Sequence, residues 1–209
     1  MTRSTERREH WDHVYGSKSP QQVSWYQDTP ESSLELIAHT GAGPEAAVID
    51  VGGGASLLVD HLLDAGYRDL TVLDVSERAL ELARSRLGQR ANDVAWIHAD
   101  VTAVELDHHY DVWHDRAVFH FLTDEDDRRR YGELLHATVP PAGHVIVATF
   151  APDGPERCSG LPVVRYSPDS LTGALGPDLS LVETWDERHR TPAGRTQHFI
   201  FCRFRRDES

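Results

Sequence analysis

The sequence lacks several features that define whole classes of protein. Its 209 residues contain no uninterrupted apolar stretch of about 18 residues, so no membrane-spanning helix is expected. Cys158 and Cys202 are the only cysteines, too few for a framework of several disulfides. The first ten residues have no apolar core of the kind a signal peptide requires. We therefore expect a cytoplasmic protein that does not engage a membrane.

Positive charge is also scarce. The chain carries 34 acidic and 21 basic side chains, which gives a formal net charge of −13. Such a surface repels a phosphate backbone, so nucleic acid is not expected as a partner. Hydrophobic residues make up 39% of the chain, enough for a buried core, and the length suits one α/β domain.

Patterns that bind metal ions are missing too. His10 and His13 stand one helical turn apart and His108 and His109 are adjacent, but neither pair has a convincing third and fourth ligand. No Cys-x-x-Cys motif occurs. We therefore expect no metal site.

Short apolar segments alternate with helical patterns through the middle of the chain. Strands are predicted over residues 46–51, 70–75, 94–97, 110–114 and 144–150, and helices over 56–65, 76–87 and 123–136. Thr123 and Asp126 have capping-box spacing and are expected to open the last of these helices. Strand–helix alternation at this rhythm predicts a parallel sheet with helices on both faces.

The two ends of the chain differ from this middle region. Residues 5–15 and 30–40 predict two helices, the second with Pro30 at its first position. Residues 181–187 and 197–205 predict strands joined only by a turn, so they should pair antiparallel. We expect residues 1–44 to form a helical cap of the same domain, and residues 45–209 to form its core.

A glycine-rich segment, residues 50–56, directly follows the first predicted strand. Ligands of open parallel sheets bind beyond the carboxyl ends of the strands, and glycines there let the backbone approach them. The dinucleotide motif G-x-G-x-x-G would need a glycine where Leu57 stands, and the Asp50 carboxylate would oppose a pyrophosphate. These two departures disfavour a dinucleotide oxidoreductase.

Acidic residues follow three successive strands. Asp50, Asp74 and Asp100 stand at the ends of the first, second and third, and no lysine suited to bind phosphate accompanies them. A carboxylate suits an aminoacyl cation, a ribose hydroxyl or an adenine amino group. The pattern therefore predicts a phosphate-free, positively charged adenosine ligand.

These motifs resemble those of class I S-adenosylmethionine-dependent methyltransferases. Asp50-x-Gly52-x-Gly54 resembles their first motif, with Ser56 in place of a third alternate glycine. The resemblance spans about residues 46–205 and implies a Rossmann-like, doubly wound, seven-stranded α/β sheet that is mostly parallel and ends in an antiparallel hairpin. It also implies S-adenosylmethionine as cofactor. The cofactor-binding residues implied are Trp11, Tyr15, Trp25, Asp50, Gly52, Gly54, Asp74, Val75, Asp100, Val101 and His114.

Two shorter segments resemble narrower groups. Residues 11–26 resemble the N-terminal segment of small bacterial methyltransferases and of the protein-lysine methyltransferases called methyltransferase-like proteins. Residues 113–117 resemble the Asp-Arg-Gly-Ala element of thiopurine S-methyltransferases, with Ala117 in place of the glycine. The implied reaction is in-line methyl transfer to a small-molecule nucleophile, with a thiol or similar soft acceptor favoured. A protein-lysine N-methyltransferase with a protein substrate, and a non-catalytic S-adenosylmethionine-binding protein, are the alternatives.

Candidate catalytic residues stand where the fourth predicted strand ends. Asp115 could contact the methionine ammonium or a cationic substrate, and Arg116 could hold an anionic one. His120 is the best placed histidine for taking a proton, and His114 is a further candidate. Core or surface positions for both histidines fit the sequence equally well. The aromatic residues near the N-terminus could cover a sulfonium by cation–π contact or simply anchor the cap: Trp11, Tyr15, Trp25 and Tyr26.

Overall fold

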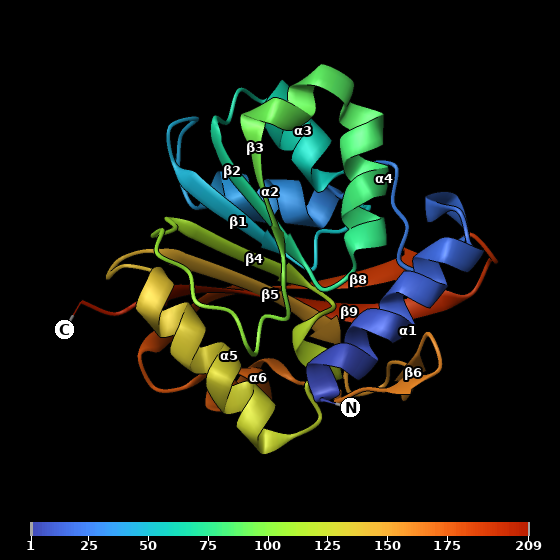
Figure 1. Ribbon diagram of the computed structural model, residues 1–209. Coiled ribbons are helices and arrows are strands. Elements are labelled where there is room, and N and C mark those ends of the chain that lie inside the picture. Colours follow the sequence, from blue (N-terminus) through green and yellow to red (C-terminus); the bar gives the residue numbers. More distant parts are fainter. Residues whose placement is uncertain (1, 209) are drawn as a thin grey trace.

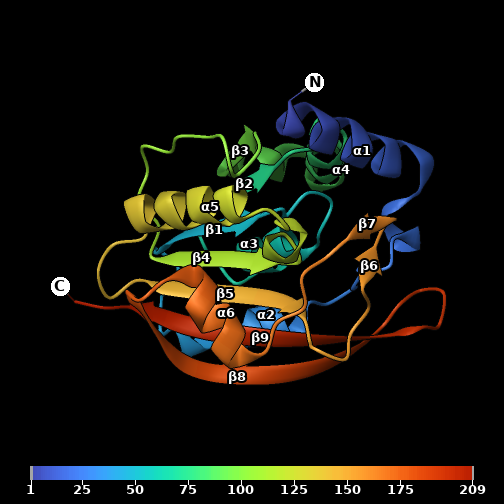
Figure 2. The same cartoon turned by 90° about the horizontal axis from the view of Figure 1, so that it is seen from below.

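The computed structural model describes residues 2–208, which form one seven-stranded sheet between two layers of helices (Figures 1 and 2). The strand order is β3-β2-β1-β4-β5-β9-β8. All neighbours pair parallel except β5 with β9 and β9 with β8, which pair antiparallel. The strands are β1 (Ala47–Val51), β2 (Asp69–Asp74), β3 (Val94–His98), β4 (Val112–Arg116), β5 (His144–Phe150), β8 (Leu179–Arg190) and β9 (Thr196–Arg206). The predicted fold class is confirmed.

Burial on both faces explains why the parallel strands are nearly continuous apolar runs. One apolar cluster joins Ile49 of β1 to α5 (Glu125–Thr138) and α6 (Pro168–Leu175). The other joins Val48 to α2 (Glu31–His39), α3 (Leu58–Asp64) and α4 (Glu77–Leu87). Adjacent residues of one strand therefore serve opposite faces of the sheet.

The ends of the helices follow local capping chemistry. Ser76 caps α4 as predicted, because its hydroxyl accepts a hydrogen bond from the Ala79 N–H. The predicted start of α5 at Thr123 is wrong. Its cap is Asp124, whose carboxylate accepts from the Asp126 N–H, so the helix begins at Glu125. Pro30 precedes α2 as its cap and is not its first residue.

The N-terminal helix α1 (Arg3–Ser17) lies apart from these two layers, at the carboxyl ends of the parallel strands (Figure 1). A short hairpin of β6 (Arg157–Cys158) and β7 (Leu161–Pro162) lies beside it (Figure 2). Neither this hairpin nor α6 was predicted. No helix within residues 2–208 is both long enough and apolar enough to cross a membrane.

Candidate active site

The loop after β1 is tight because buried carboxylates press against it. Gly52 and Gly54 have φ angles of 70° and 39°, which favour glycine. A Cβ atom on Gly53 would lie 2.4 Å from Asp50 Oδ2, and one on Gly54 would lie 2.6 Å from Asp74 Oδ2. The glycines thus bring bare backbone alongside two acidic side chains.

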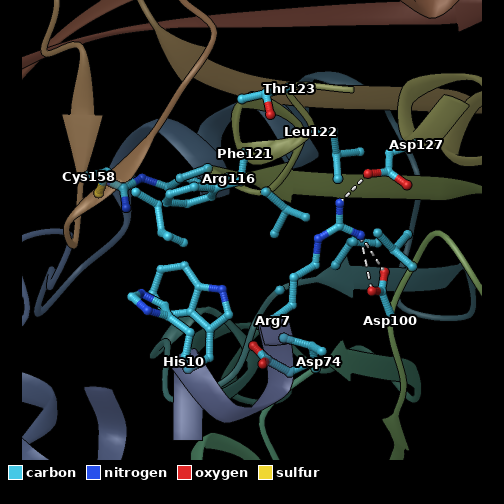
Figure 3. A pocket seen from close by; sticks show the side chains of 18 of the residues that line it. Arg7, His10, Asp74, Asp100, Arg116, Phe121, Leu122, Thr123, Asp127 and Cys158 are labelled. Carbon is cyan, nitrogen blue, oxygen red and sulfur yellow. Dashed lines mark hydrogen bonds and ion pairs between the residues drawn. The ribbon is translucent and has the colours of Figure 1, made fainter. Parts of the chain in front are cut away.

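A cavity of about 440 Å³ opens beside this loop, within the usual size range of ligand pockets (Figure 3). Its acidic end is defined by Asp74 and Asp100, with Val75 and Val101 beside them. Its other end, which we call the aromatic end, is lined by Trp11, Arg116, Phe121 and Phe199. The cavity is therefore divided into a polar and a mostly apolar half.

Asp74 is buried at the end of β2. Its Oδ1 accepts a hydrogen bond of 2.8 Å from the Ser76 N–H. Burial, together with the nearby Asp50 and Asp12 charges, raises the pKa of Asp74 to about 7. Near neutral pH, a ligand group that donates a hydrogen bond to Asp74 would therefore stabilise the ionised form of this carboxylate.

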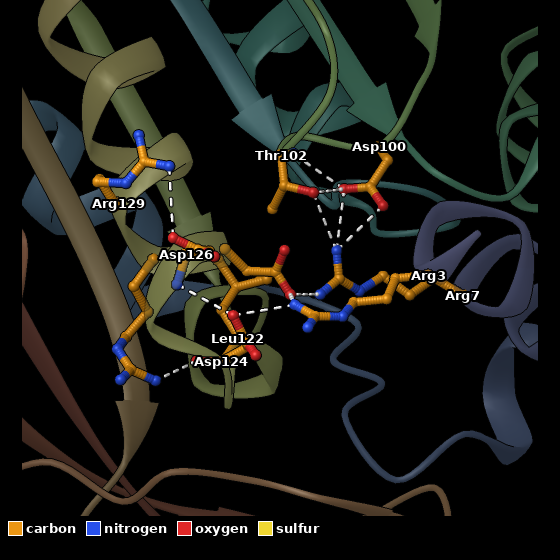
Figure 4. A network of polar contacts seen from close by, with 10 residues as sticks. Arg3, Arg7, Asp100, Thr102, Leu122, Asp124, Asp126 and Arg129 are labelled. Atoms are coloured by element: carbon orange, nitrogen blue, oxygen red, sulfur yellow. Dashed lines mark hydrogen bonds and ion pairs between the residues drawn. The ribbon is translucent and has the colours of Figure 1, made fainter.

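Asp100, just after β3, is held by Thr102 and by Arg7 of α1. Arg7 Nη1 lies 3.1 Å from Asp100 Oδ2, and the same guanidinium bonds Asp127 of α5. Burial on its own raises the pKa of Asp100, but the hydrogen bonds from Thr102 and Arg7 bring it below its ordinary value. Arg3 adds a 2.9 Å ion pair with Asp124. Arg7 and Arg3 thus fasten α1 across the acidic end (Figure 4).

Asp50 does not line the main cavity. It faces an adjoining cavity of about 40 Å³, which shares Tyr15, Gly52, Trp25 and Arg116 with the larger one. Of the cofactor-binding residues that the motifs imply, Asp50, Gly54 and His114 alone lie outside the lining of the main cavity, and Asp50 and His114 line the smaller one. Gly54 stays close through its contact with Asp74.

Arg116 is the one predicted catalytic residue that lines the main cavity. Its Nη1 donates to the Trp25 carbonyl at 3.0 Å, its Nη2 lies 3.4 Å from Glu187 Oε1, and its Cζ lies 4.8 Å from the centre of the Phe199 ring. Burial lowers the pKa of Arg116, and the negative charge of Glu187 offsets only part of this decrease. Arg116 is thus a fixed cation at the aromatic end.

Two of the predicted catalytic residues, Asp115 and His120, are buried and line neither cavity. Asp115 is fully buried, and it accepts hydrogen bonds from Val118 N, Phe119 N and the Tyr131 hydroxyl. These bonds hold the turn after β4 and leave the Asp115 carboxylate no access to a ligand. Burial raises its pKa to about 6.

His120 is also fully buried and lines neither cavity. Its Nδ1 accepts a hydrogen bond from the Phe150 N–H, and burial lowers its pKa to about 3. The basic nitrogen is therefore occupied and its protonated form is disfavoured. His120 cannot take a proton from a substrate in this arrangement.

Several lining residues had no distinctive signal in the sequence. Arg7 and His10 lie on α1, and Gln197 and Phe199 lie on β9, far along the chain from the glycine loop. Only the position of β9 next to β5 could have indicated the last two. Cys158 lines the cavity as a buried thiol with a raised pKa. Within residues 2–208, no cluster of three His, Cys, Asp or Glu side chains is arranged to hold a metal ion.

Comparisons with known proteins agree with this geometry. Residues 48–143 match the family described as "Methyltransferase domain". The chain is 27% identical over 128 residues to an "eEF1A lysine and N-terminal methyltransferase" of Danio rerio, a match that covers 61% of this chain and 18% of that protein. The chain thus spans less than a fifth of the length of this curated relative.

Solved structures with the same fold cover nearly all of the chain. One, titled "Conversion of a Disulfide Bond into a Thioacetal Group during Echinomycin Biosynthesis", has a TM-score of 0.76, 22% identity and coverage of 96% of this chain and 91% of that one. Another is the N-methyltransferase NodS from Bradyrhizobium japonicum WM9 in complex with S-adenosyl-l-homocysteine, with a TM-score of 0.74, 17% identity and coverage of 97% and 99%. The chain therefore carries the domain and fold of the class I S-adenosylmethionine-dependent methyltransferases.

The residues present fit S-adenosylmethionine. The glycine loop leaves no room for a Cβ, so its backbone can lie against a ligand, and Asp74 and Asp100 offer acceptors for ribose hydroxyls and an adenine amino group. Phosphate would meet carboxylates here.

Proposed function

We propose that this protein transfers a methyl group from S-adenosylmethionine to a small-molecule nucleophile. The observation that carries the proposal is the single cavity that joins two acidic strand ends to an aromatic end. S-adenosylmethionine, when bound, supplies a methyl group on a positively charged sulfur, which a nucleophile displaces in line. The protein has to bind, align and exclude water.

The side chains divide this work between the two ends of the cavity. Asp74 and Asp100 hold the nucleoside, and Gly52 leaves room for its backbone approach. Trp11 and Phe121, whose ring centres lie 5.1 Å apart, exclude water at the aromatic end and offer faces that attract a sulfonium. An acceptor placed against them is aligned by packing.

His120 is sealed in the core and His114 faces the smaller cavity, so neither supplies a general base at the main cavity, and His10 of α1 is the histidine in its lining. Thiolates and neutral amines need no such base, whereas alcohols gain from one. A soft acceptor therefore requires the least from the residues at this cavity. Arg116 favours an acceptor that carries an anionic group.

A protein-lysine N-methyltransferase is the second candidate, favoured by the identity to the Danio rerio relative. Against it, the lining carboxylates that could attract a lysine ammonium are not at the aromatic end. Those other than Asp74 and Asp100 belong to α1 and to the start of α5: Glu6, Asp124 and Asp127. A lysine ammonium at the aromatic end would instead meet the Arg116 cation, a like-charge contact that costs free energy.

Transfer of labelled methyl groups from S-adenosylmethionine tests the proposal. Thiols, phenols, amines and a mixture of folded proteins are offered in parallel to the wild type and to Gly54→Val, in which the new side chain would collide with Asp74. We expect label on small thiols or anionic acceptors with the wild type and none with the variant. Label on proteins alone would overturn the small-molecule assignment.

A further inference from the structure

We propose that His114 is a positioning residue, which together with Ser33 fixes the Asp50 carboxylate to receive the α-ammonium group of the cofactor's aminoacyl chain. This inference rests on the proposed function, because it concerns S-adenosylmethionine at the same site. It assigns a role to three buried polar side chains, linked by hydrogen bonds, that the proposed methyl transfer does not otherwise use.

The three side chains, Asp50, His114 and Ser33, come from three different elements. His114 Nδ1 lies 2.8 Å from Asp50 Oδ1, and His114 Nε2 lies 2.9 Å from Ser33 Oγ. Their exposed fractions are only 5% for Asp50, 2% for His114 and 1% for Ser33. Asp50 on β1 and His114 on β4 are direct partners in the strand register, and Ser33 reaches them from α2. The sheet itself therefore fixes their spacing.

The hydrogen bonds between these three side chains are consistent with one arrangement of their donors and acceptors. With Nδ1–H donating to Asp50, Nε2 of a neutral ring accepts the Ser33 hydroxyl proton. Each end of the imidazole is held, so the ring cannot rotate. One carboxylate oxygen of Asp50 is thereby fixed, and the direction of the other follows.

The second oxygen, Oδ2, points to the glycine loop. It lies so close to Gly53 that a Cβ there would be 2.4 Å away. Among the residues that the structure describes, no arginine or lysine forms an ion pair with Asp50, and His114 is its single partner of that kind. A buried carboxylate without a full cationic partner is costly, and a ligand ammonium would offset that cost. The adjoining cavity that Asp50 and His114 line is where such a group would enter.

These three side chains lie where the aminoacyl part of the cofactor would be expected. The adjoining cavity shares Gly52 with the main cavity, whose acidic end holds the nucleoside. A group that extends from the nucleoside past Gly52 reaches Asp50. The nucleoside itself touches Asp74 and Asp100 and does not depend on His114.

Two ligands that differ in the aminoacyl chain separate this role from a general loss of structure. S-adenosylhomocysteine carries the α-ammonium group, and 5′-methylthioadenosine has the same nucleoside without it. We expect His114→Leu to weaken binding of S-adenosylhomocysteine about tenfold, the effect of losing one charge-assisted contact. Binding of 5′-methylthioadenosine should change less than twofold. Both are measured by titration calorimetry.

Two further variants sharpen the test. His114→Asn keeps an N–H donor near the Nδ1 position and should recover most of the lost affinity for S-adenosylhomocysteine. His120→Leu is the matched control, because His120 is an equally buried histidine that lines neither cavity. It should lower the melting temperature without changing the ratio of the two affinities.

The possible failures are distinguishable. If His114→Leu weakens both ligands equally, or neither, the positioning role is wrong while the proposed function stands. The same holds if His114→Asn binds no better than His114→Leu. If the wild type binds neither nucleoside, the proposed function fails and this inference fails with it.

Discussion

Asp50, Asp74 and Asp100 are equally buried, yet each is held by different partners. Asp50 bonds His114, Asp74 accepts from a backbone N–H, and Asp100 is paired with an arginine. For two of them the pKa reflects this difference, since burial raises the pKa of Asp74 to about 7 while the hydrogen bonds from Thr102 and Arg7 lower that of Asp100. The acids at three successive strand ends are therefore held in three different electrostatic environments.

The raised pKa of Asp74 predicts a stability change with pH. Its folded pKa of about 7 exceeds the ordinary value of 3.8, so the folded protein retains a proton that the unfolded chain releases. Stability from this group is present below pH 4 and is lost as pH rises to 7. Asp74→Asn should therefore raise the free energy of unfolding at pH 8 by on the order of 2 kcal/mol, measured by urea titration.

The same substitution should show no gain near pH 4, where both forms are neutral. Asp93→Asn, at an exposed acid, serves as the control. Asp74→Asn should also weaken S-adenosylhomocysteine binding, since the amide accepts fewer hydrogen bonds than the carboxylate. A stability difference that is equal at both pH values would contradict the buried ionised carboxylate.

Gly54 allows a second test at a single position. Gly54→Ala places a Cβ 2.6 Å from Asp74 Oδ2 at a φ of 39°, so it should abolish detectable S-adenosylhomocysteine binding. Gly41→Ala has a similar left-handed φ of 75° but open space around it. It should cost about 1 kcal/mol of stability and leave binding unchanged. Equal binding losses in both variants would show that strain, and not the Asp74 contact, matters.

At the scale of single residues, the sequence indicates the acids more reliably than the residues after β4. Strand ends and glycines place Asp74 and Asp100 at the cavity because parallel strands share one carboxyl edge. Asp115 lies near the end of β4 and His120 follows that strand, but their side chains turn inward to accept hydrogen bonds from backbone N–H groups. The direction of these side chains depends on the conformation of the turn after β4, which no sequence pattern indicates.

Among the elements, α1 contributes most to the site. Arg7 connects the turn after β3 to α5 by contacting Asp100 and Asp127, and Asp12 accepts a 2.6 Å hydrogen bond from Ser76 at the start of α4. Polar contacts thus connect α1 to three walls of the cavity. Its aromatic residues, Trp11 and Tyr15, complete the covering.

Loss of the Arg7 contacts should loosen α1. Arg7→Ala should speed amide hydrogen exchange along α1 and accelerate dissociation of S-adenosylhomocysteine, because the helix covers the acidic end. Arg8→Ala removes the next arginine, which is exposed and makes no ion pair within residues 2–208. It should change neither rate. An exchange pattern in Arg7→Ala that equals the wild type would contradict the fastening role.

The predicted elements with strong periodicity are the ones that the structure contains. The alternating strands and the final hairpin follow from apolar runs and a single turn signal, and the sheet pairs them as expected. β6 and β7 have two residues each, too few for a pattern. Thr123 and Asp124 are both good caps, and only the structure shows that Asp124 is used.

Over the whole molecule, the site is assembled from distant parts of the chain. The acids come from the first half, the aromatic end draws Phe199 from β9, and α1 covers both. Sequence spacing predicts the first group because each acid stands at or near the end of its own strand. The covering depends on long-range contacts such as the one between Arg7 and Asp127, 120 residues apart.

The charge and shape of the cavity suit a cationic adenosine cofactor and not a dinucleotide. Titration calorimetry of the wild-type protein with S-adenosylhomocysteine and, separately, with NAD measures this preference without any substitution. We expect one saturable site for S-adenosylhomocysteine and no heat of binding for NAD. Binding of NAD without binding of S-adenosylhomocysteine would contradict this expectation.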